Sequence, residues 1–395
     1  MENKMSELKT IDKTYVANTY GRFPVEIVSG KGSVLVDNEV KKYIDLGSGI
    51  AVNAFGAGDE VWKEAVKAQL DKIPHTSNLY YTEPCALLAK MLCERTGMKK
   101  VFFGNSGAEA NECSIKVARK YSAEKKGPGC FTIVTLQNSF HGRTLTTLAA
   151  TGQDHYHELF QPLTPGFVHA PANDFETLKK LALESNAAGI MMEIVQGEGG
   201  VVPLSEDFVI RTAAFAKEND IPLMIDEVQT GNGRTGKLYA YMNYGIEPDI
   251  VSTAKGIGGG LPLGACLMGE KVQYVLGAGD HGSTFGGNPV ACAGALTILS
   301  RIDDKLLEEV REKSAYIFSE FSGADGMESI SGLGLMIGIK PVGPAAKIVN
   351  AAIEKGVLAL TAKDRIRLLP ALNIPMDQLK EAVAVLKQLC SEIRE

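Results

Sequence analysis

Two short apolar runs in the middle of the chain, residues 221–225 and 250–251, each lead to a titratable side chain and then to glycines. The first run stops at Asp226, and the second stops shortly before Lys255. Short apolar runs bounded by turn residues are typical of buried strands. In open parallel sheets, ligands bind beyond the carboxyl ends of the strands. We therefore expect Asp226 and Lys255 to meet over a small-molecule site.

A lysine and an aspartate in this arrangement suit one cofactor in particular. Lysine amines form Schiff bases with carbonyl groups, including that of pyridoxal phosphate. A buried aspartate keeps the pyridine nitrogen of that cofactor protonated, which makes the ring an electron sink. The alternative interpretation is a structural ion pair at the end of a strand, because such pairs also perturb titration.

The pattern around these runs predicts an α/β fold. Helical stretches such as residues 206–218 separate short apolar segments, which argues for a mainly parallel sheet with helices on both faces. The first part of the chain, residues 25–49, instead alternates in short segments and predicts an antiparallel meander. Further strands are expected at residues 100–103, 131–136, 189–193 and 265–268, and further helices at residues 59–70, 83–96, 110–121 and 290–322.

Composition limits the possible functions. A chain of 395 residues predicts two or three domains, and 45% hydrophobic and 22% charged residues are ordinary globular values. A net charge of -6 without a basic tract argues against a nucleic-acid partner, and the six histidines show no metal-ligand spacing. No apolar run approaches a membrane span, and the polar N-terminus has no signal region, so we expect a cytoplasmic protein. The seven cysteines form no CxxC and are expected to be reduced.

Several other loops carry groups suited to anions or rings. Residues 104–109 join a strand to a helix with small residues, so backbone amides and the Ser106 hydroxyl could bind one phosphate. Phe140 could stack on a ring, and Arg143 could bind a carboxylate. An ordinary turn, a core phenylalanine and a surface arginine are the alternatives.

Three more segments carry charged or hydroxyl side chains that could belong to a site. Glu198 follows a strand within a glycine-rich loop, and residues 281–289 bring hydroxyl groups to the start of a helix. Arg365 and Arg367 lie on one face of a predicted strand, where one could point into a site and the other could be a solvated edge residue. Each segment has a structural alternative, but several anion-suited loops at one edge of one sheet favour a shared site.

Taken in chain order, these segments resemble the class III aminotransferases of pyridoxal-phosphate fold type I. The resemblance covers about residues 15–390 and rests on NTYGRFP, FFGNSGAEANE, SFHGRT, MMEIVQGEGGV, MIDEVQTGNGRTGKLYAY, STAKGIGGGLPLGA, GSTFGGNPVACA and RLLPAL. It implies a large domain with a mainly parallel seven-stranded sheet and a smaller α+β domain built from both chain ends. The implied limits are residues 1–60 and 301–395 for the small domain and 61–300 for the large one.

The resemblance also implies roles for individual residues. Lys255 would bind the cofactor covalently and then act as the base for the proton shift, with Asp226 paired to the pyridine nitrogen. The other cofactor contacts would be Ser106, Gly107 and Ala108 at the phosphate, Phe140 and Val228 on the two ring faces, Gln229 at the ring hydroxyl, and Thr284 from the partner of a homodimer. The substrate contacts would be Arg143 and Arg367 on carboxylates, Glu198 as the gate of Arg367, Ser283 on an acylated amino acid, and Tyr20 at the entrance.

Within the family, the resemblance is to members that transfer the terminal amino group of N2-acetylornithine to 2-oxoglutarate. Transfer from ornithine, succinylornithine, an acetyldiaminopimelate-type donor or 4-aminobutyrate is the alternative in the same fold. A further alternative is an aminomutase of the same fold, which would need no keto-acid acceptor. A last alternative is a non-catalytic relative, against which the presence of Lys255 and Asp226 argues. The chain departs from the family pattern at residues 55–60, which lack a histidine–proline pair, and at Asn232, where an aliphatic residue is common.

Overall fold

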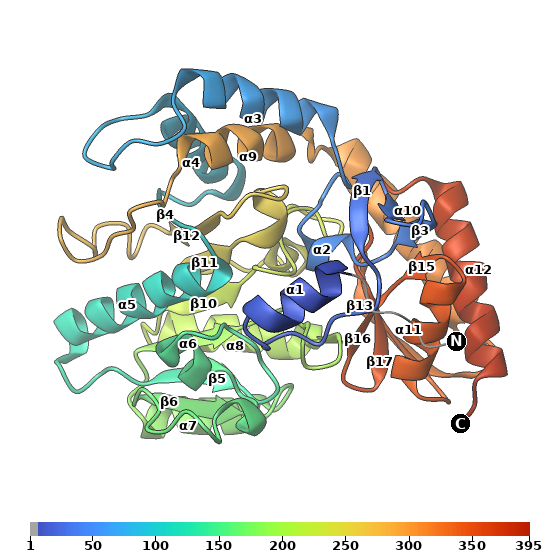
Figure 1. The fold of residues 1–395 in the computed structure, drawn as a ribbon. Coiled ribbons are helices and arrows are strands. Elements are labelled where there is room, and N and C mark those ends of the chain that lie inside the picture. Colours follow the sequence, from blue (N-terminus) through green and yellow to red (C-terminus); the bar gives the residue numbers. More distant parts are fainter. Residues whose placement is uncertain (1–6) are drawn as a thin grey trace.

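The centre of the molecule is a seven-stranded sheet in the order β4-β12-β11-β10-β7-β5-β6 (Figure 1). The computed structural model describes residues 7–395. The strands from β11 to β6 are parallel, and β12 runs antiparallel to both of its neighbours, which confirms the predicted mainly parallel sheet. The strands are β4 (Lys100–Gly104), β5 (Ile133–Leu136), β6 (Phe167–Ala170), β7 (Gly189–Met192), β10 (Leu223–Asp226), β11 (Ile250–Thr253) and β12 (Gly264–Met268).

Helices cover both faces of this sheet, because alternate side chains of a strand point to opposite sides. Met224 packs in one buried cluster with Ile115 of α5 (Gly107–Lys126). Its neighbour Ile225 belongs to the other cluster, which includes residues of α8 (Glu206–Glu218). A parallel strand buried on both faces reads as a continuous apolar run, which is why the sequence displayed these strands clearly.

The remaining elements of the central part surround the sheet. The helices α3 and α4 both pack against α9 at one side of the sheet (Figure 1). These elements are α3 (Glu60–Lys72), α4 (Glu83–Thr96), α6 (Leu145–Ala150), η1 (Asp154–Tyr156), α7 (Phe175–Glu184), β8 (Val195–Gln196), β9 (Val202–Pro203), η2 (Ala240–Asn243), η3 (Lys255–Ile257) and α9 (Pro289–Arg301).

The two chain ends form a second group of elements. The expected antiparallel meander is present, and β15 adds to it in parallel beside β3, so this sheet combines both ends of the chain. Figure 1 shows the blue N-terminal strands beside the red C-terminal helices. The elements are α1 (Glu7–Tyr15), β1 (Ile27–Lys31), β2 (Val34–Asp37), β3 (Lys42–Asp45), α2 (Ser48–Ala51), α10 (Asp304–Phe321), β13 (Met327–Leu333), β14 (Met336–Pro341), α11 (Ala345–Glu354), β15 (Val357–Leu358), β16 (Leu360–Ala362), β17 (Arg365–Leu368) and α12 (Met376–Glu392). The domain limits at residues 60 and 300 stay predictions.

The prediction of one helical tract over residues 290–322 is wrong. The tract is two helices, α9 and α10, separated at Ile302 and Asp303. Asp303 has an extended backbone, and its carboxylate accepts a hydrogen bond from the amide of Leu306 at 2.8 Å. An aspartate that caps a new helix in this way ends the preceding one, although the apolar spacing continues on both sides.

Other sequence expectations have mixed outcomes. Strand β6 was not among the strands expected from apolar runs, and the seven-stranded count came from the family resemblance. Across residues 7–395 no helix is long and apolar enough to span a bilayer. All seven cysteines are free thiols. Residues 1–6 of the expected polar arm lie outside the described residues.

Removal of the Asp303 cap should weaken α10 measurably. We expect Asp303→Ala to lower the free energy of unfolding by about 1 kcal/mol, because one amide of the first turn loses its acceptor. Asp304→Ala is the matched control, since it removes an equal charge that makes no capping bond and should cost only a few tenths of a kcal/mol. Urea denaturation of both variants measures the difference, and equal losses would contradict the capping role.

Candidate active site

The carboxyl ends of the parallel strands surround a cavity of about 490 Å³. Strand β10 delivers Asp226 to it, and the segment after β11 delivers Lys255. The sequence prediction that these two side chains share a site is therefore consistent with the structure. The predicted residues that line the cavity are Ser106, Gly107, Ala108, Phe140, Arg143, Asp226, Val228, Gln229 and Lys255.

The Asp226 carboxylate is buried and held by donors from three parts of the chain. Its Oδ2 accepts hydrogen bonds from Asn111 Nδ2 at 2.7 Å and from His141 Nδ1 at 2.8 Å. Its Oδ1 accepts one from the Val228 amide at 3.0 Å. These three bonds fix the carboxylate in place at the end of β10. A carboxylate fixed in this way suits a protonated pyridine nitrogen.

Asn111 and His141 are site residues that sequence reasoning did not assign. Asn111 lies in the second turn of α5, and His141 lies between Phe140 and the loop that follows. Both line the cavity, and both are buried. No local pattern marks them, because their role depends on the distance to Asp226 across the fold. Asn111 Nδ2 also donates to the carbonyl of His141 at 2.8 Å, so the two support each other.

Lys255 is buried at the start of the one-turn helix η3 and has a left-handed backbone, with φ of 49°. Burial lowers the pKa of the Lys255 amine, against the opposing charge of Glu198. A lysine with a lowered pKa exposes a larger fraction of neutral amine, which is the nucleophilic form. The amine is therefore suited to covalent attachment of a carbonyl compound.

The N-terminus of α5 forms one wall of the cavity. Ser106 caps this helix, accepting a hydrogen bond from the Glu109 amide, and Gly107 and Ala108 begin its first turn. A side chain at Gly107 would lie 2.6 Å from a methyl carbon of Val228, so glycine is needed for this close approach. Free amides and the positive end of a helix dipole suit a phosphate group.

Arg367 reaches the same region from a different sheet, on β17. Its Nη1 contacts Glu198 Oε1 at 2.5 Å and Gln229 Oε1 at 3.4 Å, and its Nε is buried without a partner. Burial opposes ionisation of Glu198, but the charge and hydrogen bond of Arg367 outweigh it and lower the pKa of that carboxyl. The site thus holds the guanidinium of Arg367, and the counterion of this group in the structure is the half-buried Glu198 side chain.

Arg143 is exposed and contacts aromatic rings instead of a carboxylate. Its guanidinium carbon lies 4.9 Å from the centre of the Tyr156 ring and 5.7 Å from that of Phe140. The structure pairs it with no carboxylate in residues 7–395. A planar cation next to the cavity with free donors suits a substrate carboxylate.

Five predicted residues do not line this cavity: Glu198 and Arg367, which reach it only through Gln229, and Tyr20, Ser283 and Thr284. Tyr20 lines a separate cavity of about 430 Å³, and Thr284 is exposed. Ser283 accepts a hydrogen bond from Asn105 at 3.1 Å, and Asn105 is a lining residue. Because the resemblance assigns Thr284 to the partner subunit, its role stays a prediction, as do those of Tyr20 and Ser283.

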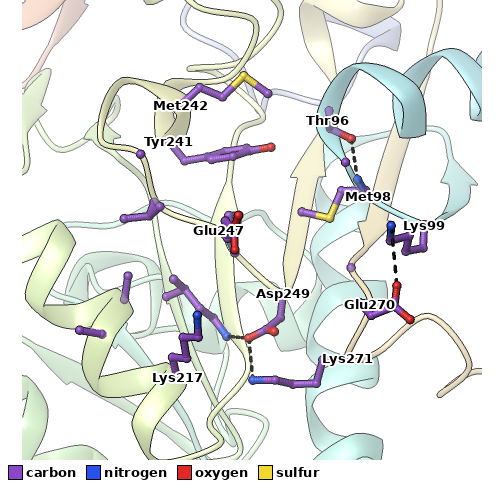
Figure 2. A pocket seen from close by; sticks show the side chains of 18 of the residues that line it. Thr96, Met98, Lys99, Lys217, Tyr241, Met242, Glu247, Asp249, Glu270 and Lys271 are labelled. Atoms are coloured by element: carbon purple, nitrogen blue, oxygen red, sulfur yellow. Dashed lines mark hydrogen bonds and ion pairs between the residues drawn. The ribbon is translucent and has the colours of Figure 1, made fainter.

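A larger cavity, of about 850 Å³, lies near the opposite ends of the same strands (Figure 2). It is lined by Lys217 of α8, Met98 and Asp249, among others. Asp249 is engaged there by Lys271 at 3.2 Å and by the Leu223 amide at 2.9 Å. None of the predicted site residues lines it, so we assign the chemistry to the smaller cavity, which holds the buried amine and carboxylate.

Comparison with known proteins agrees with this geometry. The aminotransferase class-III family matches residues 15–390, and the chain belongs to that family. It is thus a pyridoxal-phosphate-dependent aminotransferase.

Among its relatives, the acetylornithine aminotransferase of Haemophilus ducreyi is 48% identical over 98% of this chain and 99% of that protein. The one from Methanocaldococcus jannaschii is 42% identical over 98% of both chains. The structure of N-acetylornithine aminotransferase from Stenotrophomonas maltophilia has a TM-score of 0.83 at 31% identity, covering 97% of this chain and 98% of that one. The ornithine aminotransferase of Toxoplasma gondii reaches a TM-score of 0.93 at 28% identity, covering 99% and 96%.

The cavity fits the cofactor of this family. A carboxylate, an amine and a helix N-terminus converge on one cavity, and within residues 7–395 Asn111 Oδ1 and His141 Nε2 are buried there without hydrogen-bond partners. The carboxylate, the amine and the helix N-terminus match the ring nitrogen, the aldehyde and the phosphate of pyridoxal phosphate, respectively.

Glu227, which follows Asp226, should make stability depend on pH. Burial raises the pKa of Glu227 to about 7, against hydrogen bonds from Thr230 and the Tyr241 amide. The folded protein therefore holds this proton more tightly than the unfolded chain. The resulting stability is present below the ordinary glutamate pKa and is lost as pH rises through about 7. Between about pH 5 and 8, the free energy of unfolding of the wild type should fall by about 3 kcal/mol relative to Glu227→Gln. Urea denaturation across this range is the measurement, and parallel curves for the two proteins would contradict it.

Proposed function

We propose that this aminotransferase moves the terminal amino group of N2-acetylornithine to 2-oxoglutarate, giving N-acetylglutamate 5-semialdehyde and glutamate, a step of arginine biosynthesis. The observation that carries the proposal is the pair of arginines beside the Lys255 and Asp226 cavity. One, Arg367, has the displaceable partner Glu198, and the other, Arg143, contacts only aromatic rings and is paired with no carboxylate of residues 7–395. Two substrates that bear carboxylates and bind in turn suit such a pair. The names of the relatives support the choice of donor.

Different residues of the chain bind the cofactor and move the proton during the reaction. Pyridoxal phosphate, when bound, accepts the amino group from one substrate and passes it to the other by withdrawing electrons through its ring. Asp226 holds the proton of the ring nitrogen, and Ser106, Gly107 and Ala108 bind the phosphate. Phe140 and Val228 pack on the ring faces, and Gln229 donates to the ring hydroxyl. Lys255 binds the cofactor and moves the proton between the two carbon atoms that change.

The substrates are oriented by the remaining groups. Arg367 binds the α-carboxylate of 2-oxoglutarate, which adjoins the reacting carbon, when Glu198 moves aside. N2-acetylornithine reacts at the end of its side chain, far from its carboxylate, so Glu198 pairs with Arg367 while this donor is bound and Arg143 takes the donor carboxylate. Ser283 contacts the acylated amino acid, and Tyr20 lines the entrance. Alternation between the Glu198 carboxylate and a substrate carboxylate keeps the buried Arg367 charge paired at each stage, which avoids the cost of leaving it unpaired.

We also propose a homodimer. Tyr80, Tyr81 and Leu79 are strongly exposed, as is Phe285 beside Thr284. Asn78 ties these two segments together through hydrogen bonds to the carbonyls of Ser283 and Gly286. A contiguous exposed apolar patch is typical of an interaction surface. A partner that covers it would bring Thr284 close to a second copy of the site.

The donor is tested by a half-reaction survey. The cofactor-loaded protein is mixed with N2-acetylornithine, ornithine, succinylornithine or 4-aminobutyrate, and the visible absorbance of the bound cofactor is followed. We expect the fastest change with N2-acetylornithine. Turnover of ornithine, the donor of a structurally similar enzyme, without any response to N2-acetylornithine would remove the proposal. Borohydride treatment and peptide mapping should label Lys255 whichever donor is best.

The role of Arg367 separates transamination from an aminomutase. Arg367→Ala should raise the KM for 2-oxoglutarate by about 10- to 100-fold, because a charge-assisted hydrogen bond is lost. Arg365→Ala is the matched control, since Arg365 lies on the same strand but binds Ser331 at 3.0 Å, and its KM should change by less than about twofold. Steady-state kinetics with varied 2-oxoglutarate measure both. Undiminished turnover of Arg367→Ala without any keto acid would favour an aminomutase.

A further inference from the structure

Asn232 is a buried polar residue close to the segment that carries Lys255. It lies between Gly231 and Gly233 in the turn that follows β10, with φ of 58°. Asparagine tolerates this left-handed conformation better than most residues. The side chain is buried, with only 3% of the residue exposed.

The Asn232 amide connects this turn to the segment that carries Lys255. Its Nδ2 donates to Thr253 Oγ1 at 3.1 Å and to the carbonyl of Ala254 at 3.2 Å. Ala254 immediately precedes Lys255, and its carbonyl belongs to the peptide group that leads into the lysine. A Cβ at Gly256, on the other side of the lysine, would lie 3.3 Å from the Asn232 Cβ. Asn232 therefore packs along the backbone on both sides of Lys255.

This backbone needs support because it is not in a favoured conformation. Lys255 has a positive φ, which is rare for residues with a side chain. Ala254 precedes it in extended backbone, outside any helix or strand. The other donor to the Ala254 carbonyl is the amide of Ile257, at 3.3 Å, within the short turn of η3 itself. The Asn232 bond is thus the contact that fixes this peptide relative to β10.

The other end of the Asn232 side chain argues against a role in stability alone. Its Oδ1 is buried and has no hydrogen-bond partner. A buried polar atom without a partner is unfavourable, and an apolar side chain of the same shape would avoid this cost. The amide is thus retained at an energetic disadvantage, which fits a functional contribution from its donor end.

We infer that Asn232 is a positioning residue for Lys255: its Nδ2 holds the Ala254–Lys255 peptide so that the lysine amine points into the cavity beside Asp226. This inference rests on the proposed role of Lys255 but not on the identity of the amino donor. Asn232 itself does not line the cavity, whereas Ala254 and Lys255 do, so its effect is transmitted through the lysine backbone.

The test uses two variants that lack the amide in different ways. Asn232→Leu keeps the side-chain shape without the donor, and Asn232→Gly keeps the positive φ without any side chain. For both, kcat should fall by about tenfold with the KM of both substrates within about twofold, because misplacement of a reacting group affects the chemical step. The cofactor-free variants should also attach pyridoxal phosphate to Lys255 more slowly than wild type, followed by visible absorbance. Leucine is strained at this positive φ, so the urea midpoint of the cofactor-free Leu variant should fall, whereas the Gly variant adopts the same φ without strain and separates the loss of the donor from that strain.

Asn219→Leu is the matched control, because its amide also donates to a backbone carbonyl, that of Phe215, far along the chain from Lys255. It should leave kcat and cofactor attachment at wild-type values. The inference is overturned if both Asn232 variants keep wild-type attachment rates and kcat, or if the losses of the Gly variant only follow a fall in its urea midpoint. Since attachment precedes any choice of donor, failure here leaves the proposed substrate intact, and an unexpected donor leaves this inference intact.

Discussion

The structure depends on one buried carboxylate at the end of a parallel strand. An ionised group is costly to bury unless hydrogen bonds replace its lost water. Asp226 obtains these bonds from a helix side chain, Asn111, from a loop side chain, His141, and from the backbone of Val228. Strand β10, helix α5 and the loop after β5 must therefore keep their relative positions for this charge to persist. The cofactor site is a consequence of the same constraint.

The neighbouring carboxyl groups show how selective this arrangement is. Glu193 and Glu227 are as buried as Asp226. Burial, followed by the Asp226 charge, raises the pKa of Glu193, and burial raises that of Glu227 to about 7. Three adjacent carboxyl groups could not all be ionised without strong repulsion. Asn111, His141 and the Val228 amide all donate to Asp226, which fixes this carboxylate where a ring nitrogen needs it. When the surroundings of neighbouring carboxyl groups give them different pKa values, these groups can serve different roles.

The sequence predicts much of this site, and the limits of that prediction have a physical cause. Lys255 and Asp226 are predicted to share a site because apolar runs mark parallel strands and ligands bind at their carboxyl ends, and in the structure both line one cavity. Asn111 and His141 were not found, because a helix-interior asparagine and a loop histidine carry no local signal of a contact across the fold. The break between α9 and α10 was missed for a related reason: the apolar spacing continues through it, and one capping aspartate decides the outcome. Long-range contacts and single caps are the parts that periodicity does not encode.

The turn after β10 explains why distant parts of the chain act together. Within a few residues of Asp226, Gln229 contacts Arg367, and Asn232 holds the backbone before Lys255. In the same turn, Arg234 is buried and donates to the carbonyls of Leu335 and Pro370 on the C-terminal part of the chain.

Burial lowers the pKa of Arg234 to about 9, and carbonyl oxygens rather than a carboxylate accept its hydrogen bonds. A guanidinium held by carbonyl dipoles is directional, so it fixes the C-terminal strands relative to the turn. Arg367 stands on one of those strands, which pair with each other in register. The same turn therefore positions three side chains: Arg367, which is proposed to bind the substrate, and Asp226 and Lys255 at the cofactor site. A displacement of this turn would disturb all three groups at once, whereas a change in a surface loop would not.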